Sequence, residues 1–428
     1  MVDDTEESSY EIRAVILAAG KGTRMLSELP KVLHEIFGKP LLGWVLDAID
    51  RLKNVVVIGH GADMAEEYLK KFPNSSTVLQ DKQLGTGHAL MCAREKLKGF
   101  KGKVFVLCGD TPLITSTSLK KLLSNHDTHG ASLSVMTAIF DDPTGYGRIV
   151  RAPDGSVKEI VEEKDATAEI RQIKEVNAGI YYFNWEEIEP ALDDLKDNNA
   201  QGEYYLTDIV SWAHSKGLKT QGYTIEDNWE IFGINSREHL AVATDIMREN
   251  KLKELMRFGV TIVQPSTVSI SPDTKIGRDA VVYPNTFING KNNIGRGCNL
   301  GPFAHIRGGC EIGENVKIGN FVELKNAEVK ANTNISHLSY VGDATVGEGV
   351  NVGAGVITAN YNSVTKTKSK TIIEDGASVG SNTVLVAPVV LGKKAFVAAG
   401  SVVTKNVEEN SLAISRGSQK NIANWVKN

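Results

Sequence analysis

In the first half of the chain, short apolar runs alternate with segments whose apolar residues recur at helical spacing. The runs at 14–20, 55–60 and 103–110 (AVILAAG, VVVIGH and KVFVLCGD) are typical of buried strands. Segments 40–52 and 118–126 have the helical spacing. This alternation predicts a Rossmann-like α/β domain with a mostly parallel sheet. Because ligands bind beyond the carboxyl ends of parallel strands, we expect the loops after AVILAAG and VFVLCGD to face one crevice.

The second half carries an aliphatic residue at every sixth position, ten times in succession. These positions are Ile270, Ile276, Val282, Ile288, Ile294, Leu300, Ile306, Ile312, Ile318 and Leu324. The pattern resumes from Ile373 to Val403. A period of six is typical of the hexapeptide-repeat parallel β-helix, in which each aliphatic side chain points into the core and three hexapeptides form one coil. We therefore expect residues one coil apart, such as Ser381 and Ala399, to lie one above the other.

The interruptions of this repeat indicate a functional site. The phase slips by one residue between Leu324 and Val329 and again at Val346, and it breaks over 358–372, which we expect to bulge out as a loop. Between the slips lies ISHLSYVGD, which contains His337. A regular solenoid needs no slips, and departures from local rules concentrate at functional sites. We predict a catalytic or acyl-carrier pocket around His337, with packing alone as the alternative explanation of the slips.

Between the two halves, residues 236–258 form a long charged helical segment without partner elements around it, which we interpret as a connector. The net charge of −4 argues against nucleic acid or an anionic membrane as a partner. No apolar run approaches the roughly 20 residues of a membrane span. The acidic first eleven residues resemble neither a secretory signal nor a transit peptide, so we expect a cytoplasmic protein. Four cysteines without a C-x-x-C pair are too few for a disulfide framework.

The stretch AVILAAGKGTRM at 14–25 joins a buried strand to a glycine-rich loop that carries Lys21 and Arg24. Such a loop is suited to holding a phosphate group. It matches neither common nucleotide-binding loop, because G-x-x-x-x-G-K-[ST] is missing and Met25 stands where G-x-G-x-x-G needs its third glycine. The loop predicts an anion site and leaves the kind of phosphate open.

Taken together, the motifs resemble the bifunctional N-acetylglucosamine-1-phosphate uridyltransferase/glucosamine-1-phosphate acetyltransferases of bacteria. In chain order they are LAAGKGTRM, PKVLH, LGTGHAL, GDTPLI, DDPTGYGRI, NAQGEYYLTDI, GPFAHIR, GNFVELK, SHLSYVGD, NVGAGVITANYN, LVAPV and LAISR. The first is shared by many sugar-nucleotide transferases, whereas LGTGHA with TGYGRI and GEYYLTD is far narrower. The resemblance implies that the β-helix is left-handed and forms a homotrimer, with the acetyl-transfer site between subunits.

For the N-terminal half, the resemblance implies uridylyl transfer from UTP to N-acetylglucosamine 1-phosphate with release of pyrophosphate. Arg24 and Lys31 would supply positive charge to the triphosphate and the leaving group, and Asp110 and Asn235 would hold Mg²⁺. The implied nucleotide- and sugar-binding residues are Leu17, Ala18, Ala19, Gly20, Lys31, Gln80, Gly85, Thr86, Cys108, Gly109, Asp110, Gly147, Glu162, Asn177 and Asn235. Within this set the resemblance assigns uracil to Gln80, Gly85 and Thr86, and the sugar to Gly147, Glu162 and Asn177.

For the C-terminal half, the resemblance implies transfer of acetyl from acetyl-CoA to the amine of glucosamine 1-phosphate. The amine must be neutral to attack a thioester, and His337 matches the family's base, a residue type suited to this step. The implied acceptor-binding residues are Arg307, Lys325, Tyr340 and Asn351. The implied acetyl-CoA-binding residues are Ala354, Asn360, Tyr361, Ser381, Ala399 and Arg416. One chain would then make UDP-N-acetylglucosamine, a precursor for peptidoglycan and lipopolysaccharide, in two steps.

The predicted organisation has five parts: an acidic tail at 1–10, a uridyltransferase domain at 11–235, a linker helix at 236–262, an acetyltransferase β-helix at 263–410 and a tail at 411–428 that completes the acetyl-CoA site. Four positions depart from the family pattern, namely Cys108, Ala178, Asn326 and Asn362. Two other functions stay open. The β-helix could be only an oligomerisation scaffold of a uridyltransferase, or the chain could bind sugar nucleotides as a regulator without turnover.

Overall fold

The computed structural model describes residues 11–50, 52–423 and 425. The chain divides into two compact units between Thr244 and Asp245. The division falls inside helix α9 (Arg237–Arg257), which matches the helix predicted at 236–258 to within one residue at each end. From the sequence this helix is expected to be a separate linker, whereas the contacts distribute its two parts between the units.

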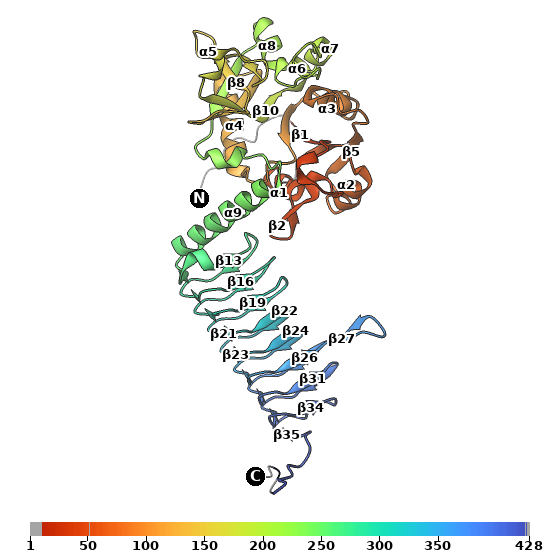
Figure 1. Cartoon of the computed structure of the whole chain (residues 1–428), viewed down its shortest axis with the longest axis vertical. Helices are drawn as coiled ribbons and strands as arrows, with labels where there is room; N and C mark the ends of the chain where they lie inside the picture. The colour runs from red at the N-terminus through yellow and green to blue at the C-terminus, as the bar shows by residue number, and fades with distance from the viewer. Residues whose placement is uncertain (1–10, 51, 424, 426–428) are drawn as a thin grey trace. The chain divides into compact units, whose positions relative to one another are not determined.

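The first unit is built on a mixed sheet with the strand order β11-β7-β10-β6-β1-β4-β5. Strands β10, β1 and β5 of this sheet are labelled in Figure 1. These strands are β1 (Ile12–Ala18), β4 (Lys53–Ile58), β5 (Ser75–Leu79), β6 (Lys103–Cys108), β7 (Leu133–Ile139), β10 (Glu175–Asn184) and β11 (Thr220–Thr224). β1, β4, β5 and β6 are mutually parallel, as is the β7–β11 pair, and β10 is antiparallel to both of its neighbours. The mostly parallel sheet is confirmed. A side branch, β8 (Arg148–Arg151) with β9 (Val157–Val161), joins at β10.

The two helices predicted in this unit exist with different limits. α1 (Leu41–Ala48) ends earlier than residue 52, where Asp50 takes a left-handed conformation (φ 53°). α4 (Ser116–His129) is longer than predicted, because the Thr115 hydroxyl caps its start and Gly130 ends it at φ 54°. The remaining helices of the unit are α2 (Ala62–Leu69), α3 (Thr86–Ala93), α5 (Ala168–Arg171), α6 (Trp185–Ile188), α7 (Ala191–Asp194) and α8 (Asp208–Ser215).

Apolar clusters cover both faces of this sheet, as a buried parallel sheet requires. Val15 packs in one cluster and its neighbour Ile16 in the other, because successive side chains of a strand point to opposite faces. Ile16 pairs with Leu107 in the parallel register, and the N–H of Gly109 donates to the carbonyl of Leu17 (2.9 Å). The loops after β1 and β6 therefore leave the sheet at one edge, as predicted.

The second unit is a parallel β-helix with three faces. The first face consists of β12 (Thr261–Ile262), β15 (Val281–Val282), β18 (Asn299–Leu300), β21 (Lys317–Asn320), β23 (Asn334–His337), β25 (Asn351–Val352), β30 (Ser378–Val379), β33 (Phe396–Val397) and β35 (Leu412–Ala413). The second consists of β13 (Ser269–Ile270), β16 (Phe287–Ile288), β19 (His305–Ile306), β22 (Glu323–Val329), β24 (Tyr340–Val346), β26 (Ile357–Ala359), β31 (Val384–Val386) and β34 (Val402–Val403). The third contains β14 (Lys275–Ile276), β17 (Asn293–Ile294), β20 (Glu311–Ile312), the ends of β22 and β24, β29 (Thr371–Ile373) and β32 (Val389–Leu391).

The period-six prediction is confirmed, since all ten aliphatic positions are buried and the most exposed, Ile294, reaches only 5%. Both slips are real as well. Leu324 pairs with Val341, and Val329 pairs with Val346, so each pair is one residue closer in sequence than a regular coil of three hexapeptides would make it. Two successive coils are thus one residue short on the stretch that contains His337.

The predicted break is a hairpin that leaves the β-helix after β26. β27 (Tyr361–Asn362) and β28 (Thr367–Lys368) pair in antiparallel fashion and project away from the stacked coils (Figure 1). The excursion is shorter than the predicted 358–372. Thr358 is still a core residue, because it is 1% exposed and its hydroxyl accepts from the N–H of Gly342 (2.8 Å).

The expectation that the long helix lacks partners is wrong for its second half. Leu252 and Leu255 of α9 belong to the apolar core of the β-helix, together with Val260 and Ile270. They cover the otherwise open first coil, which any solenoid must cap. At the other end, β35 adds a strand to the first face beyond residue 410.

Candidate active sites

A cavity of about 280 Å³ lies at the edge of the sheet where β1 and β6 end. Its lining contains ten of the residues predicted to bind nucleotide or sugar: Leu17, Ala18, Ala19, Gly20, Lys31, Gln80, Gly85, Thr86, Cys108 and Asp110. Val32, Gln83, Ala89 and Glu203 complete the lining and were not predicted. Gln83 and Glu203 stand inside or beside motifs used for the resemblance, yet nothing in the sequence distinguished them from turn or solvent-facing residues.

The glycines of the opening loop serve different purposes. A Cβ on Gly20 would meet no atom within 4 Å, so this backbone faces open space. Gly22 is left-handed (φ 59°), and a Cβ there would lie 2.6 Å from Cβ of Lys31. Only glycine combines this conformation with so close an approach. Gly22 therefore lets the loop pack directly against Lys31.

The ammonium of Lys31 joins the two residues expected to hold Mg²⁺. It pairs with the carboxylate of Asp110 and donates to Oδ1 of Asn235 (3.0 Å). Asn235 is brought there because the N–H of Ile234 donates to the carbonyl of Asp110 (2.9 Å). One carboxylate and one amide oxygen thus converge on a single cation. Mg²⁺ favours such hard oxygen ligands and keeps waters and substrate phosphates in its other positions.

The uracil set is held by two motifs that pack on each other. Nε2 of Gln80 donates to the carbonyl of Gly85 (3.0 Å). Gly85 has φ 108°, and a Cβ there would lie 2.6 Å from the carbonyl oxygen of Tyr204, so no larger residue fits. The hydroxyl of Thr86 accepts from the N–H of Leu206 (3.2 Å). LGTGHA and GEYYLTD therefore form one wall of the cavity.

The three residues expected at the sugar lie next to one another, outside the lining of the cavity proper. The N–H of Asn177 donates to the carbonyl of Gly147 (2.8 Å), and a Cβ on Gly147 would lie 3.4 Å from the carboxylate of Glu162. Burial raises the pKa of Glu162. Cys108, which lines the cavity, lies close to this group. Its thiol is 3.7 Å from the carbonyl of Gly179, and the N–H of Gly179 donates to the side chain of Asn177.

The surroundings of the Cys108 thiol disfavour the thiolate, which is its nucleophilic form. Burial raises its pKa to about 12, so it stays protonated. Gly109, which follows it, lies against β1, and a Cβ there would lie 3.2 Å from Cβ of Ala18. Arg24 differs from the rest of the set. It is exposed on the short helix Thr23–Met25, does not line the cavity, and pairs with no acidic group of the described residues.

In the second unit, five predicted residues lie along one corner, which we call the His337 corner. It contains Asn320, His337, Ala354, Ser381, Ala399 and Arg416, and Asn320 is its one member that was not predicted. Backbone hydrogen bonds link successive coils there, from the N–H of Leu338, Gly355, Asn382 and Gly400 to the carbonyls of Asn320, His337, Ala354 and Ser381. The guanidinium of Arg416 donates to the carbonyl of Ala399 (2.7 Å). The predicted stacking of Ser381 with Ala399 is confirmed by the register of β30 and β33.

The imidazole of His337 is exposed and oriented by a neighbour one coil away. Its Nδ1 lies 2.7 Å from Oδ1 of Asn320. Because an amide oxygen can only accept, Nδ1 carries the proton and Nε2 presents its lone pair. Asn320 and His337 are paired across one of the shortened coils, so the slip in the repeat was the signal that could have identified Asn320.

The residues expected to bind the acetyl acceptor lie on two different faces of the β-helix. Arg307 pairs with Glu323 (3.1 Å), and Lys325 lies on the next coil of the second face. Tyr340 lies one coil further on, where its backbone is in register with that of Glu323. Asn351 belongs to the first face, where its strand neighbours are Asn334 and Ser378, and no described contact joins it to Arg307.

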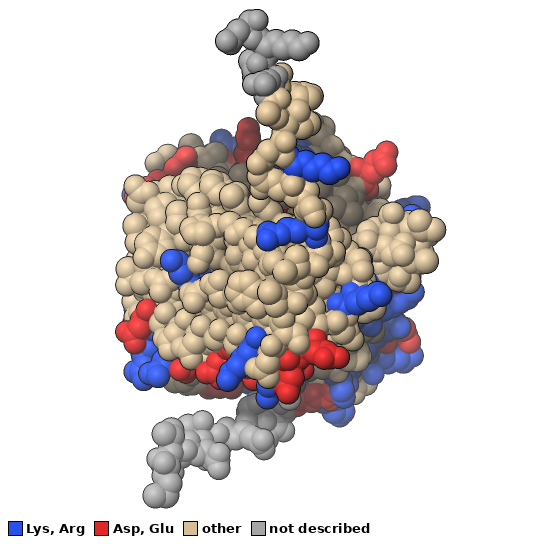
Figure 2. All heavy atoms as spheres, turned by 90° about the horizontal axis from the view of Figure 1, so that it is seen from below, with Lys and Arg blue, Asp and Glu red and all other residues tan. Residues whose placement is uncertain are grey.

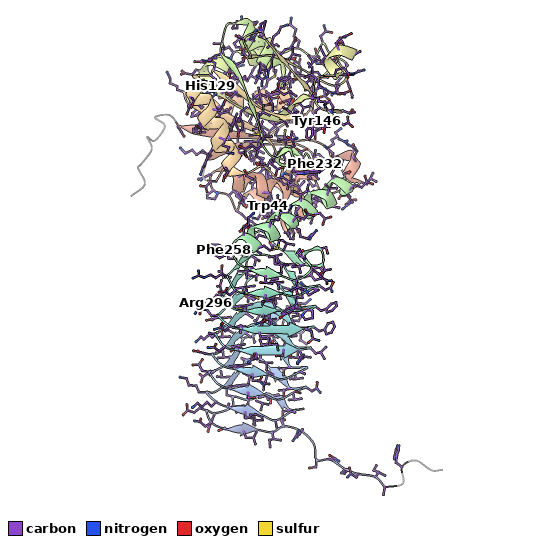
Figure 3. The ribbon with its side chains drawn as sticks, turned by 90° about the vertical axis from the view of Figure 1, so that its left-hand side faces the viewer. Trp44, His129, Tyr146, Phe232, Phe258 and Arg296 are labelled. Atoms are coloured by element: carbon purple, nitrogen blue, oxygen red, sulfur yellow. The ribbon has the colours of Figure 1, made fainter. Side chains whose placement is uncertain are left out.

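Asn360 and Tyr361 lie where the hairpin leaves the coil. Asn360 is 9% exposed, whereas Tyr361 is 54% exposed. Arg296, labelled in Figure 3, points outward from the coils and pairs with Glu314 one coil further on (3.0 Å). Like Arg307, Arg296 thus forms an exposed ion pair with a glutamate of the next coil, but it has no predicted role.

Three further features concern surface charge, helix composition and the cysteines. On the face seen in Figure 2, Lys and Arg side chains lie among Asp and Glu side chains rather than in one continuous basic area. No helix within the described residues has the length and apolar composition that crossing a membrane requires. All four cysteines are free thiols.

Comparison with known families matches both units. The nucleotidyl transferase family matches residues 13–235, bacterial transferase hexapeptide repeats match 293–326, and the hexapeptide repeat of succinyl-transferase matches 370–405. With these repeats, the second unit is a left-handed parallel β-helix.

Similar full-length proteins exist. The bifunctional protein GlmU of Shouchella clausii is 46% identical over 97% of this chain and 98% of that protein. GlmU of Geobacillus thermodenitrificans is 45% identical over 96% of this chain and 97% of that protein. Among solved structures, UDP-glucose pyrophosphorylase complexed with UDP-glucose matches with a TM-score of 0.46 and 21% identity, over 56% of this chain and 99% of that one.

Proposed function

Because the chain belongs to the family of bifunctional GlmU proteins, we propose that its two units catalyse successive steps in the synthesis of UDP-N-acetylglucosamine. The β-helix unit acetylates glucosamine 1-phosphate with acetyl-CoA. The first unit then joins the product to UTP and releases pyrophosphate. The observation that carries the proposal is the coexistence of two separate sets of functional residues, one around the cavity and one along the His337 corner.

In the first unit, the phosphate oxygen of N-acetylglucosamine 1-phosphate attacks the α-phosphorus of UTP. The bond from the α-phosphorus to the bridging oxygen breaks, and pyrophosphate leaves with the electron pair. Such transfers need positioning and charge neutralisation rather than a protein nucleophile. Lys31 and Arg24 supply positive charge, Gln80, Gly85 and Thr86 hold the base, and Gly147, Glu162 and Asn177 contact the sugar.

The oxygens of Asp110 and Asn235 fit Mg²⁺, because both already converge on the ammonium of Lys31. When bound, this ion neutralises charge on the phosphates. The loop from Leu17 to Gly20 brings the nucleotide close to the backbone, since it presents small or open surfaces to the cavity.

In the second unit, Nε2 of His337 takes a proton from the amine of glucosamine 1-phosphate as the amine nitrogen attacks the thioester carbon. The C–S bond then breaks and the thiolate of coenzyme A leaves. Asn320 holds the imidazole in the tautomer that leaves Nε2 free. Arg307 and Lys325 bind the 1-phosphate, while Ala354, Asn360, Tyr361, Ser381, Ala399 and Arg416 bind acetyl-CoA.

The active form is a homotrimer in the cytoplasm, with the acetyl-transfer site shared between copies. Two observations support the shared site. Asn351 lies on a different face from Arg307, and three bulky apolar side chains next to the His337 corner, Phe303, Phe321 and Leu338, are 49–62% exposed in one chain. Sedimentation equilibrium at several concentrations tests the trimer, and a monomer that transfers acetyl at the full rate would contradict it.

The two activities are measured separately on the wild type. Pyrophosphate release from UTP with N-acetylglucosamine 1-phosphate should require Mg²⁺, and thiol release from acetyl-CoA should require glucosamine 1-phosphate. Pyrophosphate without thiol would reduce the β-helix to a scaffold. Binding of UTP without release of either product would favour the regulatory alternative.

A further inference from the structure

One carboxylate without a role in the proposed function accepts two side-chain hydrogen bonds and faces a lysine at the root of the hairpin. Oδ1 of Asp343 accepts from Nδ2 of Asn326 (2.6 Å), and Oδ2 accepts from Nδ2 of Asn360. Nζ of Lys368 lies 4.0 Å from the same Oδ2. The side chain of Asp343 is only 13% exposed, and its bond to Asn360 is partly buried, whereas Asn326 and Lys368 approach it from the exposed side.

The three polar residues lie on successive coils of one corner. The register pairs Ala327 with Ala344, so Asn326 stands beside Asp343, and Asn360 follows on the next coil. Asn326 and Asp343 both have left-handed backbones, with φ 48° and 46°. Asn and Asp tolerate this conformation better than other residues with a Cβ. Asn326, one of the departures from the family pattern, therefore fits both the corner and the carboxylate.

The direction of the hairpin depends on this root. The carbonyl of Asn360 accepts from the N–H of Ser369 (2.9 Å), which closes the base of the excursion. Further out, Tyr361 is 54% exposed and Val364 is 89% exposed, so the hairpin buries little surface of its own. Asp343 bonds to the outgoing strand through Asn360 and faces the returning strand at Lys368.

We propose that Asp343 is a positioning residue that holds the hairpin against the coil carrying Lys325. Lys325 directly precedes Asn326, so this one carboxylate connects an acceptor-binding group with the acetyl-CoA-binding Asn360 and Tyr361. The inference rests on the proposed acetyl transfer. Without the carboxylate, the hairpin would sample other directions and acetyl-CoA would bind less tightly, while the acceptor residues on the coils would stay in place.

Asp343→Asn is the sharpest variant. The amide that replaces one carboxylate oxygen is a donor, so it cannot accept from both Asn326 and Asn360, and it loses the charge that faces Lys368. Asp375→Asn is the matched control. Oδ1 of Asp375 also bonds to a neighbouring segment, the N–H of Glu348 (2.9 Å), but it makes no described contact with the hairpin.

Two readouts decide the proposal. Steady-state thiol release should give a KM for acetyl-CoA about tenfold higher in Asp343→Asn, with the KM for glucosamine 1-phosphate changed less than about threefold. Limited trypsin digestion should cut faster at the hairpin lysines Lys366, Lys368 and Lys370. Asn326→Ala, which removes one of the bonds, should shift both readouts in the same direction by less. Asp375→Asn should match the wild type in both.

Failures of the two proposals look different. A wild type that releases no thiol would remove the proposed acetyl transfer. Equal trypsin rates at the hairpin in wild type and Asp343→Asn would overturn the role of Asp343, as would a raised KM for glucosamine 1-phosphate alone.

Discussion

Residues around the first cavity come from strand ends and loops as distant in the chain as Leu17 and Glu203, whereas those of the His337 corner recur at intervals of one coil from Asn320 to Arg416. The first set surrounds a cavity of about 280 Å³ that is open on one side and lies within one chain. The second set lies along an exposed edge. Asn351, which is expected to bind the acceptor, lies on the first face and has no described contact with Arg307. The α/β unit thus gathers most of its expected residues around one cavity, whereas the solenoid, whose coils contact only their neighbours, presents its expected residues in a row along its surface.

The largest expected effect comes from Asp110, whose loss should reduce one activity and spare the other. Asp110→Ala removes a proposed Mg²⁺ ligand and the partner of Lys31, so we expect pyrophosphate release to fall about 10³-fold. Thiol release should stay within about twofold of the wild type. Asp127→Ala is the control, because Asp127 pairs with Lys103 and lines no part of the cavity. A comparable loss in both activities would mean that the two sites are coupled.

The next effect tests the open edge of the second site. Arg307→Met removes a proposed counter-charge to the 1-phosphate, and we expect the KM for glucosamine 1-phosphate to rise about tenfold to a hundredfold. Arg296→Met is the control, since Arg296 makes a similar exposed pair with Glu314. If the two substitutions raised this KM equally, Arg307 would act only through the overall surface charge and would not bind the 1-phosphate.

Much of the β-helix was predictable because its core repeats. Each coil buries the same positions, so Ile270 and Leu324 could be assigned without knowing what lies between them. The slips were predictable for the same reason. Asn320 and Asp343 were not predicted. The slips pointed to this stretch, but Asn and Asp at solenoid corners also serve as turn residues, and their side-chain partners become evident only when the shortened coils are stacked.

In the first unit, the sequence predicted the edge at which the site forms, from where β1 and β6 end. It did not predict that Glu203 would line the cavity. Glu203 packs against Gly85, which lies far earlier in the chain, and this contact is set by the packing of two loops. The resemblance implied that Arg24 and Lys31 both supply positive charge to the triphosphate. Lys31 lines the cavity, whereas Arg24 is exposed on the short helix at Thr23–Met25.

The next prediction concerns the stability of the first unit in acid. His126 is fully buried beside Ser134 and Tyr182, and burial lowers its pKa to about 4. The unfolded chain takes up this proton near pH 6.5, so stability falls as the pH drops from about 6.5 to about 4 and then levels off. The expected loss from this group is about 3 kcal/mol.

Urea unfolding at pH 7 and pH 4, followed by tryptophan fluorescence, measures this loss. Four of the five tryptophans, Trp44, Trp185, Trp212 and Trp229, lie in the first unit, and the fifth, Trp425, is 78% exposed, so the change in fluorescence reports mainly on the first unit. His126→Gln should lack most of the acid-induced loss. The same pH dependence in variant and wild type would show that other groups, rather than His126, destabilise the unit in acid.

The smallest expected effect concerns a departure from the family pattern in the hairpin. Oδ1 of Asn362 accepts from the N–H groups of Val364 (2.9 Å) and Thr365 (3.1 Å). A carboxylate oxygen can accept the same bonds, so Asn362→Asp should change the KM for acetyl-CoA less than about twofold. A change beyond tenfold would mean that residue 362 contacts the cofactor directly.

The central claim, two independent sites on one chain, is tested most directly by His337→Ala. Its thiol release from acetyl-CoA with glucosamine 1-phosphate and its Mg²⁺-dependent pyrophosphate release from UTP with N-acetylglucosamine 1-phosphate are compared with those of the wild type. The account predicts that acetyl transfer is lost and uridylyl transfer is nearly unchanged. Undiminished acetyl transfer in the variant, or loss of both activities in a folded protein, would contradict it.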